Sequence, residues 1–279
     1  MSNIKLFVSC HQPFDIPQHP LLFPIQVGAA LANQRFDGFL YDDIGKNISS
    51  KNRSYCELTA QYWAWKNVVA DYYGFFHYRR YLYPDTTPKH PYCIKPSPTK
   101  ELLTQLGYES FAHLIERFDL ILPIGENMYL PVREHYANAP HHHRKDLELT
   151  EQIIQELHPE MASALVKYLS GPICYFGNIY IMKRQVFYDY CSWLFPILEE
   201  FDRRAGTTGY SKQELRVDGY LAERLFGIWL THVRSELHTL ELPRVHFLDG
   251  QDAMKKRFIN ALLPPGSHRR AVFKRLKRS

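Results

Sequence analysis

A histidine and two arginines end an aromatic run in the first third of the chain. Residues 72–83 begin with aromatic, strand-type side chains and continue through His77, Arg79 and Arg80, with no acid among them. Arginine offers phosphate oxygens a planar fork of donors and keeps its charge. Because open α/β sheets bind ligands at the carboxyl ends of their strands, we expect this strand tip to hold the diphosphate of a sugar nucleotide. His77 would donate to the departing phosphate, and a strand end with solvent-facing arginines is the alternative.

Four further residues complete the expected donor side. Asp43 and Asn47 flank a glycine in a polar loop, where they can bind ribose hydroxyls or a cation, or simply form an Asx-rich turn. His11 follows a short apolar strand at the start of the chain, and Lys66 lies on a helix rich in aromatic residues. The sequence contains no Asp-x-Asp, which favours cationic side chains over a metal-bridged diphosphate.

Two carboxylates at the start of a predicted helix, Asp218 and Glu223, are the candidate general bases. A general base must be an ionised carboxylate or a histidine placed near the acceptor hydroxyl. The two residues do not share a helical face, so at most one of them is expected to serve. Glu223 and Arg224 can equally form a structural ion pair, and the residues leave the choice of base open.

The acceptor side is expected to involve Asn178 and a stretch rich in tyrosine and histidine that contains Tyr136, His142 and Asp146. Three adjacent histidines in this stretch, residues 141–143, do not converge on one ion in a helix or a strand. No acid cluster lies at a fitting spacing either, so no metal site is expected there.

Charge is unevenly distributed along the 279 residues. The formal charge is +5, but residues 268–279 hold six Lys or Arg and no acid, so the rest of the chain carries −1. This near-neutral body gives no case for nucleic-acid binding. The basic tail, with its interspersed apolar residues, is expected either to contact an anionic membrane surface or to remain a solvated terminus.

Cysteine usage and apolar patterning point to a cytoplasmic protein. The five cysteines are scattered and lack CxxC spacing, so neither a zinc site nor a disulfide framework is indicated. The first residues do not have the form of a signal peptide, and no apolar run approaches the length of a membrane span. Localisation is therefore expected to be cytoplasmic, with peripheral contact at the inner membrane face.

Alternating strand and helix patterns predict an α/β fold with a mostly parallel central sheet and helices on both faces. One domain is expected over residues 1–260, followed by the basic tail at 261–279. The predicted strands are 4–9, 72–83, 118–123, 172–182 and 241–248, and the predicted helices are 54–67, 99–117, 146–169, 186–202 and 217–232.

Several blocks of residues recur together in a known pattern. The blocks are Asp43-x-Gly45-x-Asn47-Ile48-Ser49, Tyr55-Cys56-Glu57-Leu58-Thr59-Ala60, Tyr62-Trp63-x-Trp65-Lys66-Asn67, His77-Tyr78-Arg79-Arg80-Tyr81, Tyr136…His142…Asp146-Leu147, Phe176-Gly177-Asn178-Ile179-Tyr180 and Glu223-Arg224-Leu225. Together they resemble the bacterial DUF4422 family, over roughly residues 4–235. The resemblance implies a GT-A-like glycosyltransferase of capsule, exopolysaccharide or O-antigen synthesis, with some relatives associated with galactofuranose transfer.

The resemblance also refines the chemistry expected. The strand that ends in a metal-binding Asp-x-Asp in many GT-A enzymes ends here in His77-Tyr78-Arg79-Arg80, which argues against a required divalent metal. Glu223 matches the family, whereas Asp218 resembles the start of the acid-x-x-Leu-x-x-Arg helix that carries the base in other inverting enzymes. The expected activity is inverting transfer from UDP-galactofuranose or another UDP-hexose to a lipid-linked or polysaccharide acceptor. A non-catalytic carbohydrate-binding or scaffold role is the alternative.

Overall fold

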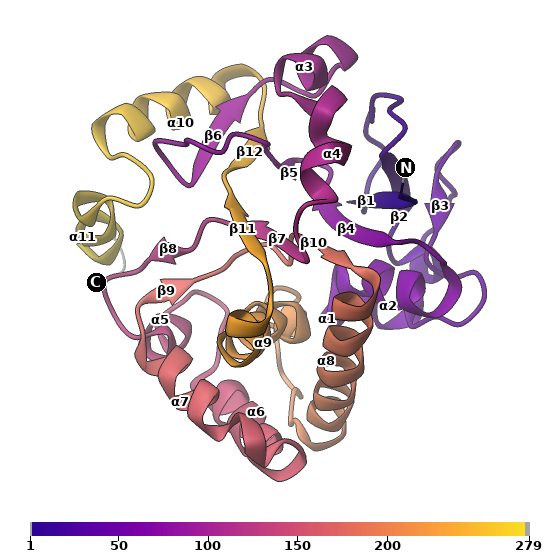
Figure 1. Cartoon of the computed structure of the whole chain (residues 1–279). Helices are drawn as coiled ribbons and strands as arrows, with labels where there is room; N and C mark the ends of the chain where they lie inside the picture. Colours follow the sequence, from indigo (N-terminus) through magenta and orange to yellow (C-terminus); the bar gives the residue numbers. More distant parts are fainter. Residues whose placement is uncertain (1, 277–279) are drawn as a thin grey trace.

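A ten-stranded sheet organises residues 2–276, the part of the chain that the computed structural model describes (Figure 1). Its strands are β1 (Ile4–Cys10), β2 (Leu22–Gln26), β3 (Leu40–Tyr41), β4 (Tyr72–His77), β5 (Arg80–Leu82), β6 (Tyr92–Lys95), β7 (Leu120–Pro123), β10 (Tyr180–Lys183), β11 (Thr239–Leu242) and β12 (Arg244–Phe247). The main path runs β11-β7-β10-β4-β1-β2-β3. From β4, pairing continues through β5 and β12 to β6.

Parallel pairing predominates along the main path. β1 lies parallel between β2 and β4, β3 is parallel to β2, and β11 is parallel to β7. β10 is the exception, because it runs antiparallel to both β4 and β7. The expected α/β class with a mostly parallel sheet is therefore confirmed. Since β1 to β4 point the same way, their carboxyl ends meet at one edge of the sheet.

Helices cover both faces of this sheet, and alternation along β1 shows how. Phe7 packs into a core with side chains of α2, α8 and α9, whereas Leu6 and Val8 belong to a second core with α3 and α4. The helices are α1 (Asn52–Tyr55), α2 (Leu58–Asn67), α3 (Lys100–Gln105), α4 (Phe111–Ile115), α5 (Val132–Ala137), α6 (Arg144–Leu157), α7 (Ala162–Ser170), α8 (Arg184–Arg204), α9 (Val217–Val233), α10 (Gly250–Leu262) and α11 (His268–Leu276).

The segment predicted as one strand over residues 72–83 is a hairpin, so that prediction is wrong in its length. β4 ends at His77, the chain turns, and β5 runs back with Arg80 opposite His77. The aromatic pattern hides the turn because Tyr78 and Tyr81 on either side of the arginines are both buried. Arg79 and Arg80 consequently lie at a hairpin tip beside the carboxyl end of β4.

Two predicted helices are interrupted. Residues 99–117 form α3 and α4, separated at Gly107, whose φ of 82° ends the first helix. Residues 146–169 form α6 and α7, separated by His158 and Pro159. Proline disfavours helical backbone in the residue before it, and His158 accordingly has a φ of −139°. Apolar periodicity continues across both breaks because each pair of helices buries side chains in one core.

The C-terminal region is helical and lies beside β6 and β12, on the side of the molecule opposite α2 (Figure 1). The predicted domain boundary at residue 260 falls inside α10, and α11 covers much of the predicted tail, whose residues 277–279 lie outside the described residues. Arg270 joins the two helices through bonds to the Asn260 amide and the Leu263 carbonyl at 2.5 and 2.9 Å. Within residues 2–276, no helix has the length and apolar character needed to cross a membrane.

Candidate functional site

The candidate site lies at the carboxyl edge of β1, β3 and β4. His11 follows β1, Asp43 follows β3, and His77 ends β4, so parallel pairing brings three expected donor-side residues to one edge. The ring centroids of His11 and His77 are 6.0 Å apart. This is the edge at which open α/β sheets bind their ligands.

His77 is surrounded by positive charge. Burial, followed by the charges of Arg80, Arg79, His11 and Arg216, lowers its pKa to about 2, so its imidazole is neutral at pH 7. The backbone N–H of Arg79 donates to Nδ1 of His77 at 3.3 Å. In the neutral ring the proton therefore sits on Nε2, which can donate to a ligand.

Arg80 lies among charged side chains from several segments, and we call the surroundings of Arg80, Glu57 and Glu223 the recess. Its side chain is exposed, yet the surrounding protein and the charge of Arg244 lower its pKa. The negative charges of Glu223 and Glu57 act in the opposite direction and raise that pKa. Arg80 thus lies within the electrostatic influence of further cations, including Arg79, and of two carboxylates from other parts of the chain.

Glu57, which immediately precedes α2, is the centre of a polar network. The Asn178 amide donates to Oε1 of Glu57 at 2.8 Å and to the carbonyl of Gly219 at 3.2 Å. Burial raises the pKa of Glu57, the bond from Asn178 offsets part of that rise, and the charge of Glu223 adds to it. A raised pKa makes this carboxylate a stronger base.

Asn178 is held in an uncommon backbone conformation. Its φ is 49°, and the preceding Gly177 has a φ of 98°. This turn separates β10 from the short strand β9 (Ile173–Cys174), which pairs with β8 (Glu126–Asn127), so the strand predicted over 172–182 is interrupted here. Gln61 anchors the turn by donating to the Asn178 carbonyl at 3.1 Å. Within the described residues, Oδ1 of Asn178 is buried and has no hydrogen-bond partner.

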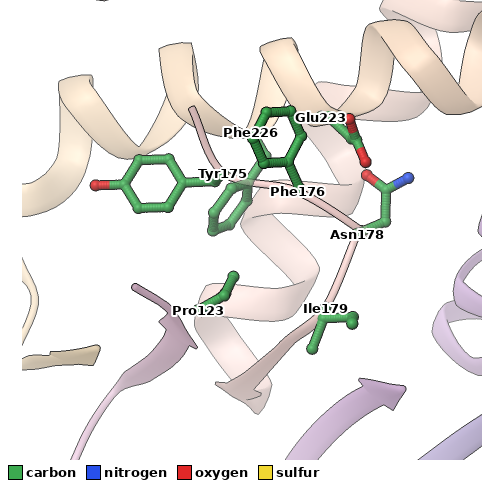
Figure 2. Close-up of a pocket in the computed structure, with 7 residues that line it drawn as sticks. All are labelled: Pro123, Tyr175, Phe176, Asn178, Ile179, Glu223 and Phe226. Atoms are coloured by element: carbon green, nitrogen blue, oxygen red, sulfur yellow. The ribbon is translucent and has the colours of Figure 1, made fainter. Parts of the chain in front are cut away.

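Glu223 has both carboxylate oxygens engaged. Oε1 accepts the backbone N–H of Gly177 at 2.6 Å, and Oε2 accepts from the buried guanidinium of Arg224 at 2.7 Å. The structural ion pair weighed from the sequence is therefore present. Glu223 also ties α9 to the turn that carries Asn178, and Figure 2 shows the ends of these two side chains facing each other.

A small pocket adjoins this pair of side chains. It has an empty volume of about 180 Å³, with aromatic and aliphatic walls and Glu223 and Asn178 as its polar members (Figure 2). The pocket is too small to hold a whole sugar nucleotide. The lining residues are Pro123, Tyr175, Phe176, Asn178, Ile179, Glu223 and Phe226.

Asp218 is placed differently from Glu223. It is fully buried in the first turn of α9, where it accepts a hydrogen bond from the Ser54 hydroxyl. Burial, and next the charge of Asp202, raises the pKa of Asp218. Of the two α9 carboxylates considered as base, only Glu223 borders the recess with Arg80.

Asp42 and Asp43, which follow β3, both bind groups of the protein itself. Asp42 is fully buried and accepts the N–H groups of Gly28 and Ala29 at 2.8 and 2.9 Å. Asp43 forms a two-bond ion pair with Arg35 at 2.6 and 2.7 Å, and this contact lowers the pKa of Asp43. In the described part of the chain, no group of three or more His, Cys, Asp or Glu is arranged to hold a metal ion.

Asn47 and Lys66 contact residues of their own loop and their own helix. The Asn47 amide donates to the carbonyls of Asp43 and Gly45, both at 2.9 Å, which is the Asx-rich turn considered from the sequence. Lys66 sits nine residues beyond Glu57, about 14 Å along the axis of α2. There its Nζ lies 3.0 Å from the ring centroid of Trp65.

Tyr136 and Asp146 from the expected acceptor side are buried. The guanidinium carbon of Arg224 lies 5.3 Å from the ring centroid of Tyr136. Asp146 accepts a hydrogen bond from the Tyr210 hydroxyl at 2.8 Å, and burial raises its pKa. Both side chains therefore lie in the protein interior, where they contact Arg224 and Tyr210.

His142 packs against Tyr220, which Arg216 also contacts, and the sequence did not single out either of these two residues. Its ring stacks on Tyr220 of α9 with centroids 4.2 Å apart, and the guanidinium carbon of Arg216 lies 5.7 Å from the Tyr220 ring. Arg216 also contributes to the positive charge around His77. Arg216, Tyr220 and Glu223 follow i, i+4, i+7 spacing on one helical face, which is the signal available in the sequence.

Comparisons with known proteins give two matches. The DUF4422 model, described as a domain of unknown function, matches residues 5–235. No curated protein matches the chain. The apo structure of the WbbM bifunctional glycosyltransferase matches with a TM-score of 0.84 and 32% sequence identity. That match covers 88% of this chain and 46% of the other, so this chain spans about half the length of that protein.

Proposed function

The chain belongs to the DUF4422 family, and from this premise we propose that it is a GT-A-like glycosyltransferase of polysaccharide synthesis. Its donor would be a nucleotide sugar, with UDP-galactofuranose first among UDP-hexoses, and its acceptor a lipid-linked or polysaccharide hydroxyl. The likeness to a glycosyltransferase structure supports the reaction class. The choice of donor and acceptor rests on the sequence resemblance alone.

One observation carries the proposal: a cationic hairpin tip and two carboxylates meet in one recess. Arg79, Arg80 and neutral His77 supply donors for a diphosphate, and the charges of Glu57 and Glu223 act on Arg80. Fixed positive charge placed where negative charge develops is an effective form of transition-state stabilisation. The same electrostatic task is often performed by a divalent metal, and we propose that the two arginines perform it here.

The proposed reaction is an in-line displacement. The acceptor hydroxyl oxygen forms a bond to the anomeric carbon, while the bond from that carbon to the diphosphate oxygen breaks. The diphosphate leaves with the bonding electrons toward Arg79, Arg80 and His77, and the hydroxyl proton passes to a carboxylate. An acceptor hydroxyl that attacks from the face opposite the leaving diphosphate inverts the anomeric centre, and a carboxylate on that face would take its proton.

We propose Glu57, rather than Glu223 or Asp218, as the proton acceptor. Glu57 has a raised pKa and lies beside Asn178, whose buried Oδ1 is unpartnered among the described residues. Glu223 is held by Gly177 and Arg224, so it positions the turn that carries Asn178. On the acceptor side, Asn178 and His142 would contact the incoming sugar, with Tyr136 and Asp146 supporting them.

Arg79→Ala tests the proposal, with Arg117→Ala as a matched exposed-arginine control near the opposite end of the sheet. Donors are first ranked by the thermal stabilisation that a panel of UDP- and dTDP-sugars gives, with manganese and with EDTA. We expect Arg79→Ala to lose transfer by about 100-fold or more and to keep its unfolding temperature, with EDTA leaving wild-type turnover unchanged. Full turnover by Arg79→Ala removes the assignment of the hairpin tip. UDP binding without acceptor-dependent UDP release supports the scaffold role instead.

A further inference from the structure

The two C-terminal helices expose an unusual amount of apolar surface. Of the thirteen exposed large hydrophobic side chains in the described residues, six lie in α10 and α11. Met254, Phe258 and Leu262 form a stripe at four-residue spacing, with exposed fractions of 70%, 67% and 61%. Ala253 is the one residue of α10 that is buried. A clustered apolar face of this kind marks an interaction surface.

The charge around this stripe identifies the class of partner. Residues 250–279 contain nine Lys or Arg and one acid, Asp252. Exposed Lys255 and Arg257 border the stripe on α10, and exposed Arg269 extends the positive charge onto α11. Apolar side chains flanked by flexible cations are the pattern of helices that lie in the interface of an anionic bilayer. A protein partner or a second copy would have to match this positive charge with acids.

Positive charge continues from these helices toward the candidate site. His246 of β12 lies within the electrostatic influence of Lys256 and Arg270 of the C-terminal helices and also of Arg80. Its pKa is lowered to about 2, first by burial and then by these and neighbouring charges. The charges of α10, α11 and the hairpin tip therefore all act on β12. Figure 1 shows α10 and α11 on the same side as β6 and β12.

We propose that α10 and α11 dock this protein on an anionic lipid bilayer. The stripe of Met254, Phe258 and Leu262 inserts among the acyl chains, and Lys255 and Arg257 extend to the headgroups. The sequence predicts membrane contact through residues 268–279, and in this proposal α10 supplies the apolar stripe that inserts. This inference goes beyond the proposed function, and it accounts for how a lipid-linked acceptor reaches a recess on a protein surface.

Flotation with lipid vesicles tests the proposal on the 279-residue protein. Two vesicle types are used, phosphatidylcholine alone and phosphatidylcholine with phosphatidylglycerol. The test variant is Met254→Ser, Phe258→Ser, Leu262→Ser, and the matched control is Val69→Ser, Leu157→Ser, Val166→Ser, which also alters exposed apolar residues. We expect wild type and control to float with the anionic vesicles, and the test variant to lose about tenfold or more of its partitioning.

Additional measurements separate docking from folding and from catalysis. Lys255→Gln, Arg257→Gln should weaken binding to anionic vesicles, and added salt should weaken wild-type binding in the same way. All variants should keep the wild-type unfolding temperature and UDP affinity. Failure of wild type to float with anionic vesicles, or equal flotation of the stripe variant, overturns the proposal. A concentration-dependent dimer that only the stripe variant loses assigns the face to a second copy of the chain and also overturns it.

Discussion

Glu57 and Glu223 influence each other electrostatically, yet the protein holds them differently. Glu223 gives one oxygen to the Gly177 N–H and the other to Arg224, whereas Glu57 accepts one bond from Asn178. The charge of Glu223 contributes to the raised pKa of Glu57. Neighbouring carboxylates in unlike environments commonly divide the work of proton transfer and charge stabilisation. Glu57 therefore suits the exchange of a proton, and Glu223 suits a fixed, paired anion.

Glu57→Gln should lower kcat by about 100-fold or more, because the amide cannot accept the acceptor's proton. A base must be ionised, and the pKa of Glu57 is raised, so wild-type activity should fall as the pH drops through a value above the usual glutamate pKa of about 4.3. The variant should lack this acid limb and keep its affinity for UDP. Profiles of kcat against pH, with calorimetry of UDP binding, measure both effects.

Glu223→Gln is the matched comparison. It leaves the buried Arg224 guanidinium without its carboxylate partner, so it should lower the unfolding temperature. A Glu223→Gln variant that folds like wild type and loses the acid limb, while Glu57→Gln retains it, would transfer the role of base to Glu223.

Asp218→Asn should separate structure from chemistry on the same helix. The pKa of buried Asp218 is raised in the folded protein, so its ionisation costs stability as the pH rises from about 4 through that raised pKa. Asparagine keeps an acceptor for the Ser54 hydroxyl without this charge. The variant should match wild type near pH 4 and become relatively more stable at higher pH, by up to about 1.4 kcal/mol per pH unit. Denaturant titrations at several pH values measure this difference, and an unchanged difference across that range contradicts it.

Two breaks in regular secondary structure, one at Cys56 and one at Asn178, bring polar residues of the site together. Cys56, with a φ of 52°, separates α1 from α2 and directs Glu57 toward the turn at Gly177 and Asn178. Asn178 in that turn has a φ of 49°. Non-glycine residues in left-handed conformations persist only where surrounding structure holds them, and they gather at functional sites. The predicted helix over 54–67 and strand over 172–182 each run across one of these interruptions.

Gly227→Ala should destabilise the packing of α9, which carries the Arg216, Tyr220 and Glu223 face. A Cβ at Gly227 would lie 1.9 Å from the Tyr168 ring of α7, so one helix must move. We expect a loss of about 1–3 kcal/mol in the free energy of unfolding. Gly206→Ala, where a Cβ would meet no atom within 4 Å, is the control and should have little effect. Equal stability of the two variants would show that α7 and α9 adjust without strain.

The two hydrophobic cores of the whole chain share the strands of one sheet. Along β4, Tyr73 and Phe75 face one core, whereas Tyr72 and Phe76 face the other. Loss of either core would expose the opposite side chains of the same strands. We therefore expect the domain proposed for residues 1–260 to behave as one cooperative unit.

Thermal unfolding should accordingly show a single transition. Far-ultraviolet circular dichroism, which follows the helices, and tryptophan fluorescence should give coincident midpoints. Trp63 and Trp229 both lie in the same core, so their fluorescence does not follow the core on the other face of the sheet. Calorimetry detects the unfolding of both cores. Two resolved calorimetric peaks would show that the domain unfolds in parts.

Much of this architecture is encoded locally. The short apolar run over residues 4–9 predicts β1, the long amphipathic pattern predicts α8, and the pattern over 217–232 predicts α9 almost to its ends. The cationic run at His77, Arg79 and Arg80 is visible in the sequence without any structure. These features depend on burial periodicity and residue chemistry, both of which a chain expresses over a few consecutive residues.

Tertiary packing decided what those residues face. The antiparallel insertion of β10 beside β4 and the meeting of Glu57 with Asn178 join segments distant in sequence. The turn that makes Arg79 and Arg80 a hairpin tip is local, but β5 is held there by its pairing with the distant strand β12. Burial distinguishes the two carboxylates of α9. Asp218 is fully buried, whereas Glu223 lines the pocket beside Asn178. Periodicity records that a side chain is buried but not which partner it meets, because partners are set by long-range packing of the whole sheet.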